Sequence, residues 1–370
     1  TTVVYQQADK ELPENYNGLG YMNLISMIFD IDLIIKKMQR NKERKPADIN
    51  LLFIEEPEAH THPQMQYVFI KNIKELLKQG ILHKDGISRK LQYIVSSHSA
   101  HIVADCDFND IKYMVHSQKN GIFEKNSVIA KNMKDLQKEY EGDAEYKQYF
   151  AFLKQYLTLN RSELFFADKA IFIEGDTERI LLPAMMKMID EEHEPEENEN
   201  YLLSQNVSII EVGAYSHIFE KFMRFIGLRK CLIITDLDCC KPVEKTDKNG
   251  RKTTKYEKAP YDVTDDNMVT SNASIKSFLK ISSIKDILSD VPVKLSWDDA
   301  AICWKRNNNG NLMIAFQYGK NGAYQPRSFE DAFFSENKEF ITSNSFSSLD
   351  PECVEKFQED NNPYELAQNS

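Results

Sequence analysis

Short apolar runs that end abruptly in acidic residues recur along this chain. The runs cover residues 51–54, 171–173 and 232–234, and the acidic residues after them are Glu55 and Glu56, Glu174, and Asp236 and Asp238. A strand that is apolar on both faces belongs inside a parallel sheet. Carboxylates at the C-terminal ends of such strands lie where open α/β sheets bind ligands. The pattern therefore predicts an α/β protein with a ligand site in each half.

The spacing of the remaining apolar residues predicts alternating helices and strands, which is the α/β pattern. In the first half we expect helices over 24–38, from Pro63 to a stop at Gly80 and over 132–160, a strand at 93–95 and a weaker β region over 111–129. In the second half we expect strands at 170–173, 207–212 and 231–235, and helices from Gly175 to Met188 and over 216–226. The last thirty or so residues are too irregular to assign.

Composition limits the class of protein. The 370 residues are 42% hydrophobic and 28% charged, as in an ordinary globular protein of one or two domains. We see no apolar stretch long enough to span a bilayer and expect no membrane partner. The six cysteines form no CxxC pair, so the sequence favours a reducing cytoplasm. The net charge of −11 excludes a uniformly basic nucleic-acid binder, but it allows a local basic groove.

The first acidic run is typical of a Walker B strand. Glu55 would orient water on Mg²⁺ and Glu56 would polarise the attacking water, although a strand that ends in surface glutamates gives the same letters. His98 ends the next strand, where a histidine can touch a γ-phosphate. The glycine turn at Gly18 and Gly20 is equally explained as an ordinary helix entry.

The second set of carboxylates predicts a metal centre. Glu174 closes one strand, Glu178 lies in the first turn of the following helix, and Asp236 and Asp238 end a later strand. Two residues apart on a strand, the aspartates are expected to point to the same side. Hard oxygen ligands suit Mg²⁺ or Mn²⁺. The structural alternatives are a helix-capping glutamate and a loop aspartate pair.

These motifs resemble known families. EEPEAHTHPQ, SSHSAHI and NGLGYMN resemble the Walker B, switch histidine and signature loop of ABC-type ATPases of the OLD (overcoming lysogenization defect) and RecF/SMC kind, and FIEGDTE with ITDLD resembles a TOPRIM domain of OLD nucleases. The resemblance implies a partial ABC-type ATPase lobe over 1–130, a helical linker over 131–166, a TOPRIM domain with a mostly parallel sheet over 167–345 and a tail over 346–370.

The resemblance also implies roles for residues in the ATPase lobe. No GxxxxGK[ST] occurs in the sequence, so the phosphate-binding loop is expected upstream of Thr1. Gly18 and Gly20 would then serve ATP and Mg²⁺ held by a second subunit, which implies a homodimer or higher oligomer.

In the TOPRIM domain the resemblance implies a site with two Mg²⁺ or Mn²⁺ ions. Glu174, Asp236 and Asp238 would form the principal centre, and Glu178 and Glu330 would support a second ion. The alternative for Glu330 is a capped surface helix that starts near Ser328. Lys320 would stabilise transition-state charge and Arg327 would hold a DNA phosphate, although both can be solvated surface residues. The basic stretch over 241–258, with a hairpin turn at Asn249-Gly250, is either a solvated loop or a contact to the DNA backbone.

The function that follows is an ATP-regulated, metal-dependent DNA endonuclease of the cytoplasm. The resemblance extends to bacterial antiphage defence of the Gabija type, with a partner protein from the defence system. Two alternatives stay open: a TOPRIM topoisomerase or primase, and a non-catalytic SMC-like clamp that binds DNA without cutting it.

Overall fold

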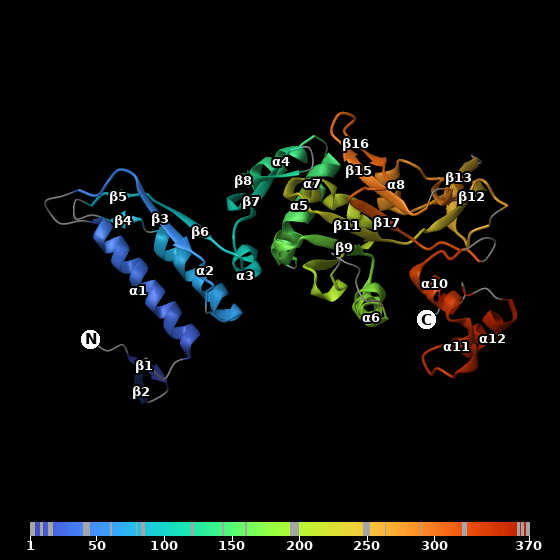
Figure 1. Cartoon of the computed structure of the whole chain (residues 1–370), viewed down its shortest axis with the longest axis horizontal. Coiled ribbons are helices and arrows are strands. Elements are labelled where there is room, and N and C mark those ends of the chain that lie inside the picture. Colours follow the sequence, from blue (N-terminus) through green and yellow to red (C-terminus); the bar gives the residue numbers. More distant parts are fainter. Residues whose placement is uncertain are drawn as a thin grey trace. The chain divides into compact units, whose positions relative to one another are not determined.

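The computed structural model divides the chain into two compact units, residues 1–166 and 167–370 (Figure 1). The structure describes residues 4–367 except for these gaps: 8–9, 14–17, 40–44, 60, 79, 83–85, 120–121, 143, 160, 193–199, 247–251, 263, 290, 320–323, 361–362 and 364–365. No helix in the described residues is long and apolar enough to cross a membrane.

The first unit contains helices and short two-stranded sheets. Its elements are β1 (Val4–Gln7), β2 (Lys10–Pro13), α1 (Leu19–Gln39), β3 (Asn50–Glu55), α2 (Pro63–Lys78), β4 (Ile81–Leu82), β5 (Ser88–Arg89), β6 (Leu91–Ser96), α3 (Ala100–Ala104), β7 (Lys112–Lys119), β8 (Ile122–Asn132), α4 (Met133–Glu139) and α5 (Ala144–Leu159). The expected helices and the expected strand at 93–95 are confirmed, and the structure shows that β3 pairs with β6 in parallel. The weak β region is the β7–β8 hairpin.

The expectation that β3 is a strand buried on both faces is wrong. Alternate residues of β3 face a core formed by α1 and α2, where Leu52 and Ile54 pack with Ile31 and Phe69. The other face is open in the described structure, with Leu51 46% and Phe53 62% exposed. The sheet has two strands and both helices lie against the same side, so only one face is covered.

The second unit is built on a six-stranded sheet of order β10-β9-β11-β17-β15-β16. Its elements are β9 (Lys169–Ile173), α6 (Asp176–Glu192), β10 (Val207–Glu211), α7 (Glu220–Ile226), β11 (Lys230–Ile234), β12 (Cys239–Thr246), β13 (Lys252–Lys258), β14 (Val269–Thr270), α8 (Ala273–Leu279), α9 (Ile284–Leu288), β15 (Val293–Asp298), β16 (Cys303–Arg306), β17 (Leu312–Ala315), α10 (Phe329–Glu336), α11 (Lys338–Ser343) and α12 (Pro351–Asp360). The first four strands of the order are parallel, and β15 and β16 are antiparallel additions at one edge.

The predicted alternation in this unit is confirmed, because each expected strand and helix of the second half is found within a few residues of its expected bounds. Strands that are buried on both sides, such as β9 with Phe172 and Ile173 both below 2% exposed, explain the continuous apolar runs. The C-terminal residues left unassigned by the sequence include α11 and α12, whose Ile341 and Phe357 share a small buried cluster with Leu366.

Candidate metal centre and nucleotide-type site

Three neighbouring parallel strands of the second unit end side by side and deliver the candidate residues. Glu174 follows β9, Asp236 follows β11 by two residues, and Gln317 follows β17 by two residues. Because β9, β11 and β17 are consecutive in the sheet, their C-terminal ends meet at one edge. This is the edge at which α/β sheets bind ligands.

Glu174 is held by three donors that meet the same oxygen. Its Oε1 accepts hydrogen bonds from the Thr235 hydroxyl, from the Asp236 backbone N–H at 3.0 Å and from Asn272 Nδ2 at 2.8 Å. Asn272 also donates to Thr235 at 2.8 Å, so the three residues form one network. Within the described residues no hydrogen bond reaches Glu174 Oε2. The network therefore fixes the carboxylate and leaves one oxygen for another ligand.

Asp236 is held in the same way. Its Oδ1 accepts from Gln317 Nε2 at 2.7 Å and from the Phe329 backbone N–H at 2.9 Å. Gln317 also accepts from the Leu237 N–H at 3.1 Å, so one buried glutamine holds both the side chain and the backbone of this segment. Burial, and after it the charge of Glu174, raises the pKa of Asp236 to about 8. Such a group is one that a cation would stabilise in its charged form.

Asp238 does not lie where strand alternation places it. β11 ends at Ile234, and Asp238 has a φ of 48° in the following turn, so the expectation that the two aspartates lie on a strand end, where alternation sets their directions, is wrong. The Asp238 carboxylate instead accepts a hydrogen bond from Arg327 Nη2 at 2.7 Å. Arg327 is only 4% exposed, so the expectation that it holds a DNA phosphate is also wrong. A buried guanidinium beside a carboxylate orients that carboxylate rather than a substrate.

Glu330 lies near enough to Asp236 and Glu178 for its charge to act on both, although it is distant from them in sequence. The alternative for Glu330 was a capped helix that starts near Ser328. This helix is present, because Ser328 caps α10 and its hydroxyl oxygen accepts a hydrogen bond from the Asp331 N–H at 3.3 Å. Nevertheless the charge of Glu330 contributes to the raised pKa values of both Asp236 and Glu178. Glu178 is buried in the first turn of α6, where burial is the largest cause of its raised pKa and Oε2 accepts from Gly175 N–H at 3.1 Å. Lys320 lies outside the described residues.

The chemistry of the donor set fits a hard divalent cation. Burial, and after it the charge of neighbouring carboxylates, raises the pKa of Asp236 and of Glu178, so a cation would stabilise both groups in their charged form, and oxygen donors are what Mg²⁺ and Mn²⁺ prefer. No group of three His, Cys, Asp or Glu side chains in the described part of the chain is already drawn together tightly enough to hold an ion.

The sequence analysis missed four residues of this network. Thr235, Asn272, Gln317 and Asp331 are polar residues at most 8% exposed, and none was assigned a role from the sequence. Asp331 accepts from the Tyr324 hydroxyl at 2.9 Å and from the Arg327 N–H at 2.8 Å, so it fixes the turn that carries Arg327. Thr235 stands inside the ITDLD motif, which was a usable signal. Asn272 and Gln317 had none, because only the fold brings them to the carboxylates.

In the first unit the structure brings together two of the nucleotide-site candidates. Glu56 follows β3 with a φ of 42°, and its Oε1 lies 3.3 Å from Nε2 of His98, which follows β6. Glu58 Oε1 accepts from Ser97 Oγ at 3.0 Å and from the His98 N–H at 2.5 Å, so it ties the two strand ends together. Glu55 is exposed at the last position of β3. Parallel pairing of β3 and β6 is what aligns these ends.

The sequence left two interpretations of Gly18 and Gly20, a glycine turn and an ordinary helix entry. Gly18 is exposed and its carbonyl accepts from the N–H groups of Tyr21 and Met22, at 3.0 and 3.2 Å, so it stands at the start of α1. Gly20 lies inside the first helical turn and not in a loop. The described structure therefore places Gly18 and Gly20 at the entry to α1, as the second interpretation states.

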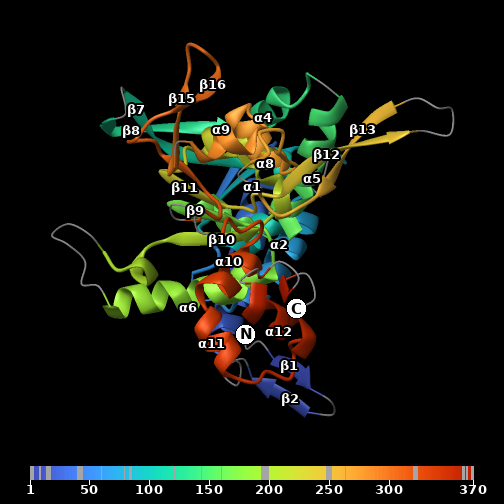
Figure 2. The ribbon, with the colours of Figure 1, turned by 90° about the vertical axis from the view of Figure 1, so that its right-hand side faces the viewer.

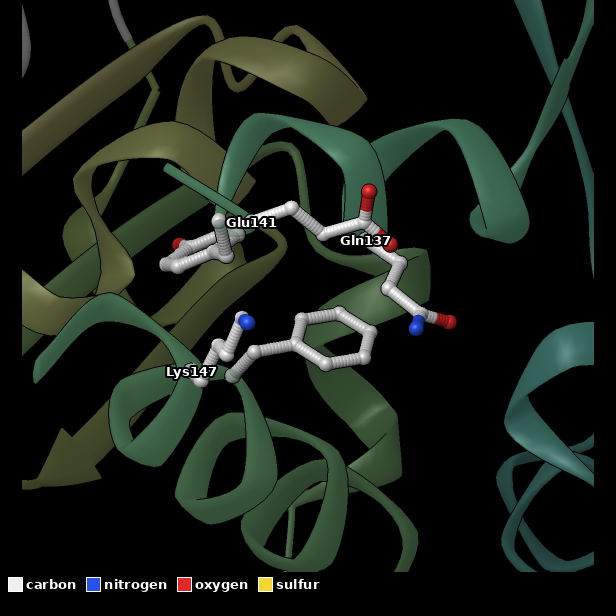
Figure 3. A pocket seen from close by; sticks show the side chains of 5 residues that line it. Gln137, Glu141 and Lys147 are labelled. Atoms are coloured by element: carbon white, nitrogen blue, oxygen red, sulfur yellow. The ribbon is translucent and has the colours of Figure 1, made fainter. Parts of the chain in front are cut away.

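A separate pocket of about 330 Å³ lies between α4 and α5 of the first unit (Figure 3). Gln137, Glu141 and Lys147 line it, together with the rings of Tyr140 and Phe150. None of these residues was singled out from the sequence. Its charged residues are one lysine and one glutamate, which define no ligand class.

Comparison with protein families identifies the class of each unit. Residues 2–103 match the AAA ATPase domain family, and residues 165–238 match the family described as the overcoming lysogenization defect protein-like TOPRIM domain. The chain thus combines an ATPase segment with an OLD-like TOPRIM segment. This confirms both the resemblance and the α/β fold class inferred from the sequence.

Two curated proteins are similar to the chain. The chain is 30% identical over 361 residues to the endonuclease GajA of Bacillus cereus strain HuB5-5, an alignment that covers 95% of this chain and 46% of GajA. It is 28% identical over 225 residues to the Old nuclease of Escherichia phage P2, which covers 60% of this chain and 33% of that nuclease. The chain therefore spans less than half the length of either relative.

A solved structure from a study of ATP-driven dimerization and DNA-stimulated activation of SMC ATPases also aligns with the chain. It covers 38% of this chain and 70% of its own, at 18% identity and a TM-score of 0.23. A score this low supports no argument about this protein.

Proposed function

We propose that this chain carries the nuclease centre of a divalent-metal-dependent DNA endonuclease whose ATPase segment regulates cutting. The observation that supports it best is the placement of Glu174 and Asp236 side by side at one sheet edge, where the Asp236 N–H donates to Glu174 Oε1 at 3.0 Å, within the segment that matches an OLD-like TOPRIM domain. The names of the relatives, an endonuclease and a nuclease, point to the same activity.

The described residues divide the work at this centre. Thr235 and Asn272 fix Glu174, and Gln317 with the Phe329 N–H fixes Asp236, so that one oxygen of each carboxylate is left for an ion. Mg²⁺ or Mn²⁺ bound there would supply an activated water and charge stabilisation for phosphodiester cleavage. We assign Glu178 and Glu330 to a second ion. We assign Asp238, whose carboxylate Arg327 orients, to the principal centre. Lys320 is assigned to the stabilisation of negative charge in the transition state.

For the first unit we propose binding of ATP with Mg²⁺. Glu55 and Glu56 at the end of β3 and His98 at the end of β6 would face the γ-phosphate, and the Glu56–His98 contact supports this assignment. Gly18 and Gly20 would serve a nucleotide shared with a second copy, in a homodimer or higher oligomer. An antiphage role with a defence partner and a cytoplasmic location are further parts of the proposal, suggested by the resemblance.

A plasmid-nicking assay with Mg²⁺, Mn²⁺ or EDTA tests the proposal. We expect cutting with either metal and none in EDTA. Glu174→Ala and Asp236→Ala should each lower the rate at least about 100-fold, because each removes a ligand from a shared ion. Asp298→Ala is the matched control, since Asp298 is a carboxylate paired with Lys305 on the β15–β16 hairpin. Normal cutting by either site variant would place the centre elsewhere, and DNA binding without cutting in any metal would favour the clamp alternative.

A further inference from the structure

The β12–β13 hairpin begins one residue after Asp238 and extends beyond the neighbouring strands of the second unit (Figure 2). Its base is anchored: Cys239 and Cys240 are buried and pair with β14, and the Ala259 N–H donates to the Cys239 carbonyl at 3.2 Å. Beyond this base the two strands pair with each other from Lys241 to Thr246. The described residues of the basic stretch, 241–246 and 252–258, therefore form a two-stranded ribbon that starts beside Asp238.

The register of the hairpin sorts its charges by face. Directly paired residues of an antiparallel ribbon project from the same face, and the face alternates at each step. One face carries the pairs Lys241–Glu257, Val243–Lys255 and Lys245–Thr253, and the opposite face carries Pro242–Tyr256 and Glu244–Thr254 and, next to the base, Lys258. The first face therefore holds three lysines against one glutamate.

The charges on this first face are not balanced. Lys245 lies 2.5 Å from Glu257, and this contact, followed by the charge of Lys241, lowers the pKa of Glu257. Lys241 and Lys255 are exposed and form no ion pair with the residues that the structure describes. The face thus keeps two uncompensated positive charges in a chain whose net charge is −11. By the same register the opposite face carries Lys252 and Lys258 against Glu244, so it has one positive charge in excess, compared with two on the first face.

We propose that the Lys241–Lys245–Lys255 face of the β12–β13 hairpin is an arm that binds the phosphate backbone of duplex DNA beside the cutting site. This inference rests on the proposed function for its substrate. An eight-residue strand is about 26 Å long, and duplex DNA carries about one charge per 1.7 Å of its axis. The arm is therefore long enough to lie along several phosphates. Lysines without a base-reading partner give affinity that is independent of sequence.

Salt-dependent binding of the full chain to a duplex of about 30 base pairs tests the arm. Fluorescence anisotropy in EDTA measures binding without cutting, at salt concentrations from about 0.05 to 0.2 M. Lys241→Ala and Lys255→Ala should each weaken binding about fivefold near 0.15 M salt and reduce the slope of log K against log salt by about one. The double variant should lose about two units of slope. Both lysines are exposed, so thermal unfolding should be unchanged.

Lys258→Ala is the matched control, because it removes the same charge from the other face of the same strand and should keep the wild-type slope. The proposal is overturned if Lys241→Ala and Lys255→Ala retain the wild-type slope, if Lys258→Ala loses as much slope as they do, or if an RNA duplex of equal length is bound in preference to DNA. If Lys241→Ala and Lys255→Ala reduce the salt slope but the wild-type protein cuts no plasmid, the nuclease proposal is rejected and the proposal of a DNA-binding arm stands. Normal cutting with unchanged slopes would reject the arm alone.

Discussion

Three of the five candidate ligands of the second unit are each held by a neutral or cationic side chain. Asn272 holds Glu174, Gln317 holds Asp236 and Arg327 holds Asp238, with donor–acceptor distances of 2.7 to 2.8 Å. Such partners orient ligands and tune their charge, and their loss typically lowers metal affinity or activity 10- to 100-fold. The candidate centre is thus defined as much by its donors as by its carboxylates.

Gln317→Ala should lower the rate of plasmid nicking about 10- to 100-fold and raise the metal concentration needed for half-maximal rate. The glutamine holds both the Asp236 carboxylate and the Leu237 N–H, so its loss frees the ligand from its orientation. Gln205→Ala is the control, because Gln205 contacts Lys169 at the opposite end of β9. An unchanged metal dependence in Gln317→Ala would show that Asp236 needs no such support.

The stability of the metal-free protein should fall as pH rises from about 4 toward about 8. Asp236 has a folded pKa of about 8, raised from 3.8, so its contribution to stability is complete below pH 4 and is lost as the pH rises through 8. Asp236→Asn keeps an acceptor for Gln317 and cannot ionise. In EDTA its melting temperature should match that of the wild type near pH 4 and exceed it by a few degrees at pH 9. A difference that does not change with pH would contradict the raised pKa.

At the scale of the element, the close approach of the β16–β17 turn to β15 sets the shape of the sheet edge. Gly310 lies in this turn, and a Cβ built on it would stand 2.2 Å from the Leu295 carbonyl oxygen and 2.5 Å from its carbon. These are backbone atoms of a buried strand and cannot move aside as a flexible side chain does. The turn therefore requires glycine for reasons of space.

Gly310→Ala should destabilise the second unit by about 2–3 kcal/mol or more, because the added methyl must displace the β15 backbone. Differential scanning calorimetry of the full chain measures this as a lower melting temperature. The control is Gly142→Ala, where a Cβ meets no atom within 4 Å. Equal melting temperatures for the two variants would mean that the turn relaxes at little cost.

At the scale of the whole molecule, two units with different candidate chemistry occupy one chain. The ATPase segment provides strand-end carboxylates and a histidine, yet none of the 370 residues supplies a GxxxxGK[ST] loop. Backbone N–H groups of such a loop cradle the β- and γ-phosphates in nucleotide sites of this type. Glu56 and His98 alone lack that cradle.

We therefore expect no ATP hydrolysis above background by residues 1–370, measured as phosphate release with Mg²⁺. A longer form that contains the phosphate-binding loop should hydrolyse ATP, and Glu56→Gln in that form should suppress hydrolysis while nucleotide binding persists. Robust turnover by the 370-residue chain would refute this expectation and would mean that its residues cradle the phosphates in another way.

The sequence by itself determined the local features of this protein. Apolar runs fixed β3, β9 and β11, the spacing of apolar residues fixed α1, α2 and α6, and the carboxylates at strand ends marked both candidate sites, because strand and helix periodicity are properties of neighbouring residues. Glu55-Glu56, Glu174 and Asp236 are local features in the same sense, because each closely follows its own apolar run in the sequence.

Only the tertiary structure decided which residues complete the sites. The order β9-β11-β17 brings Gln317 to Asp236 across 81 positions of the sequence, and the turn before α10 brings Arg327 to Asp238 across 89. The left-handed turn at Asp238 removed it from the strand alternation that the sequence implied. Contacts of this kind depend on strand order and on the burial of particular side chains, and neither is encoded in the spacing of adjacent residues.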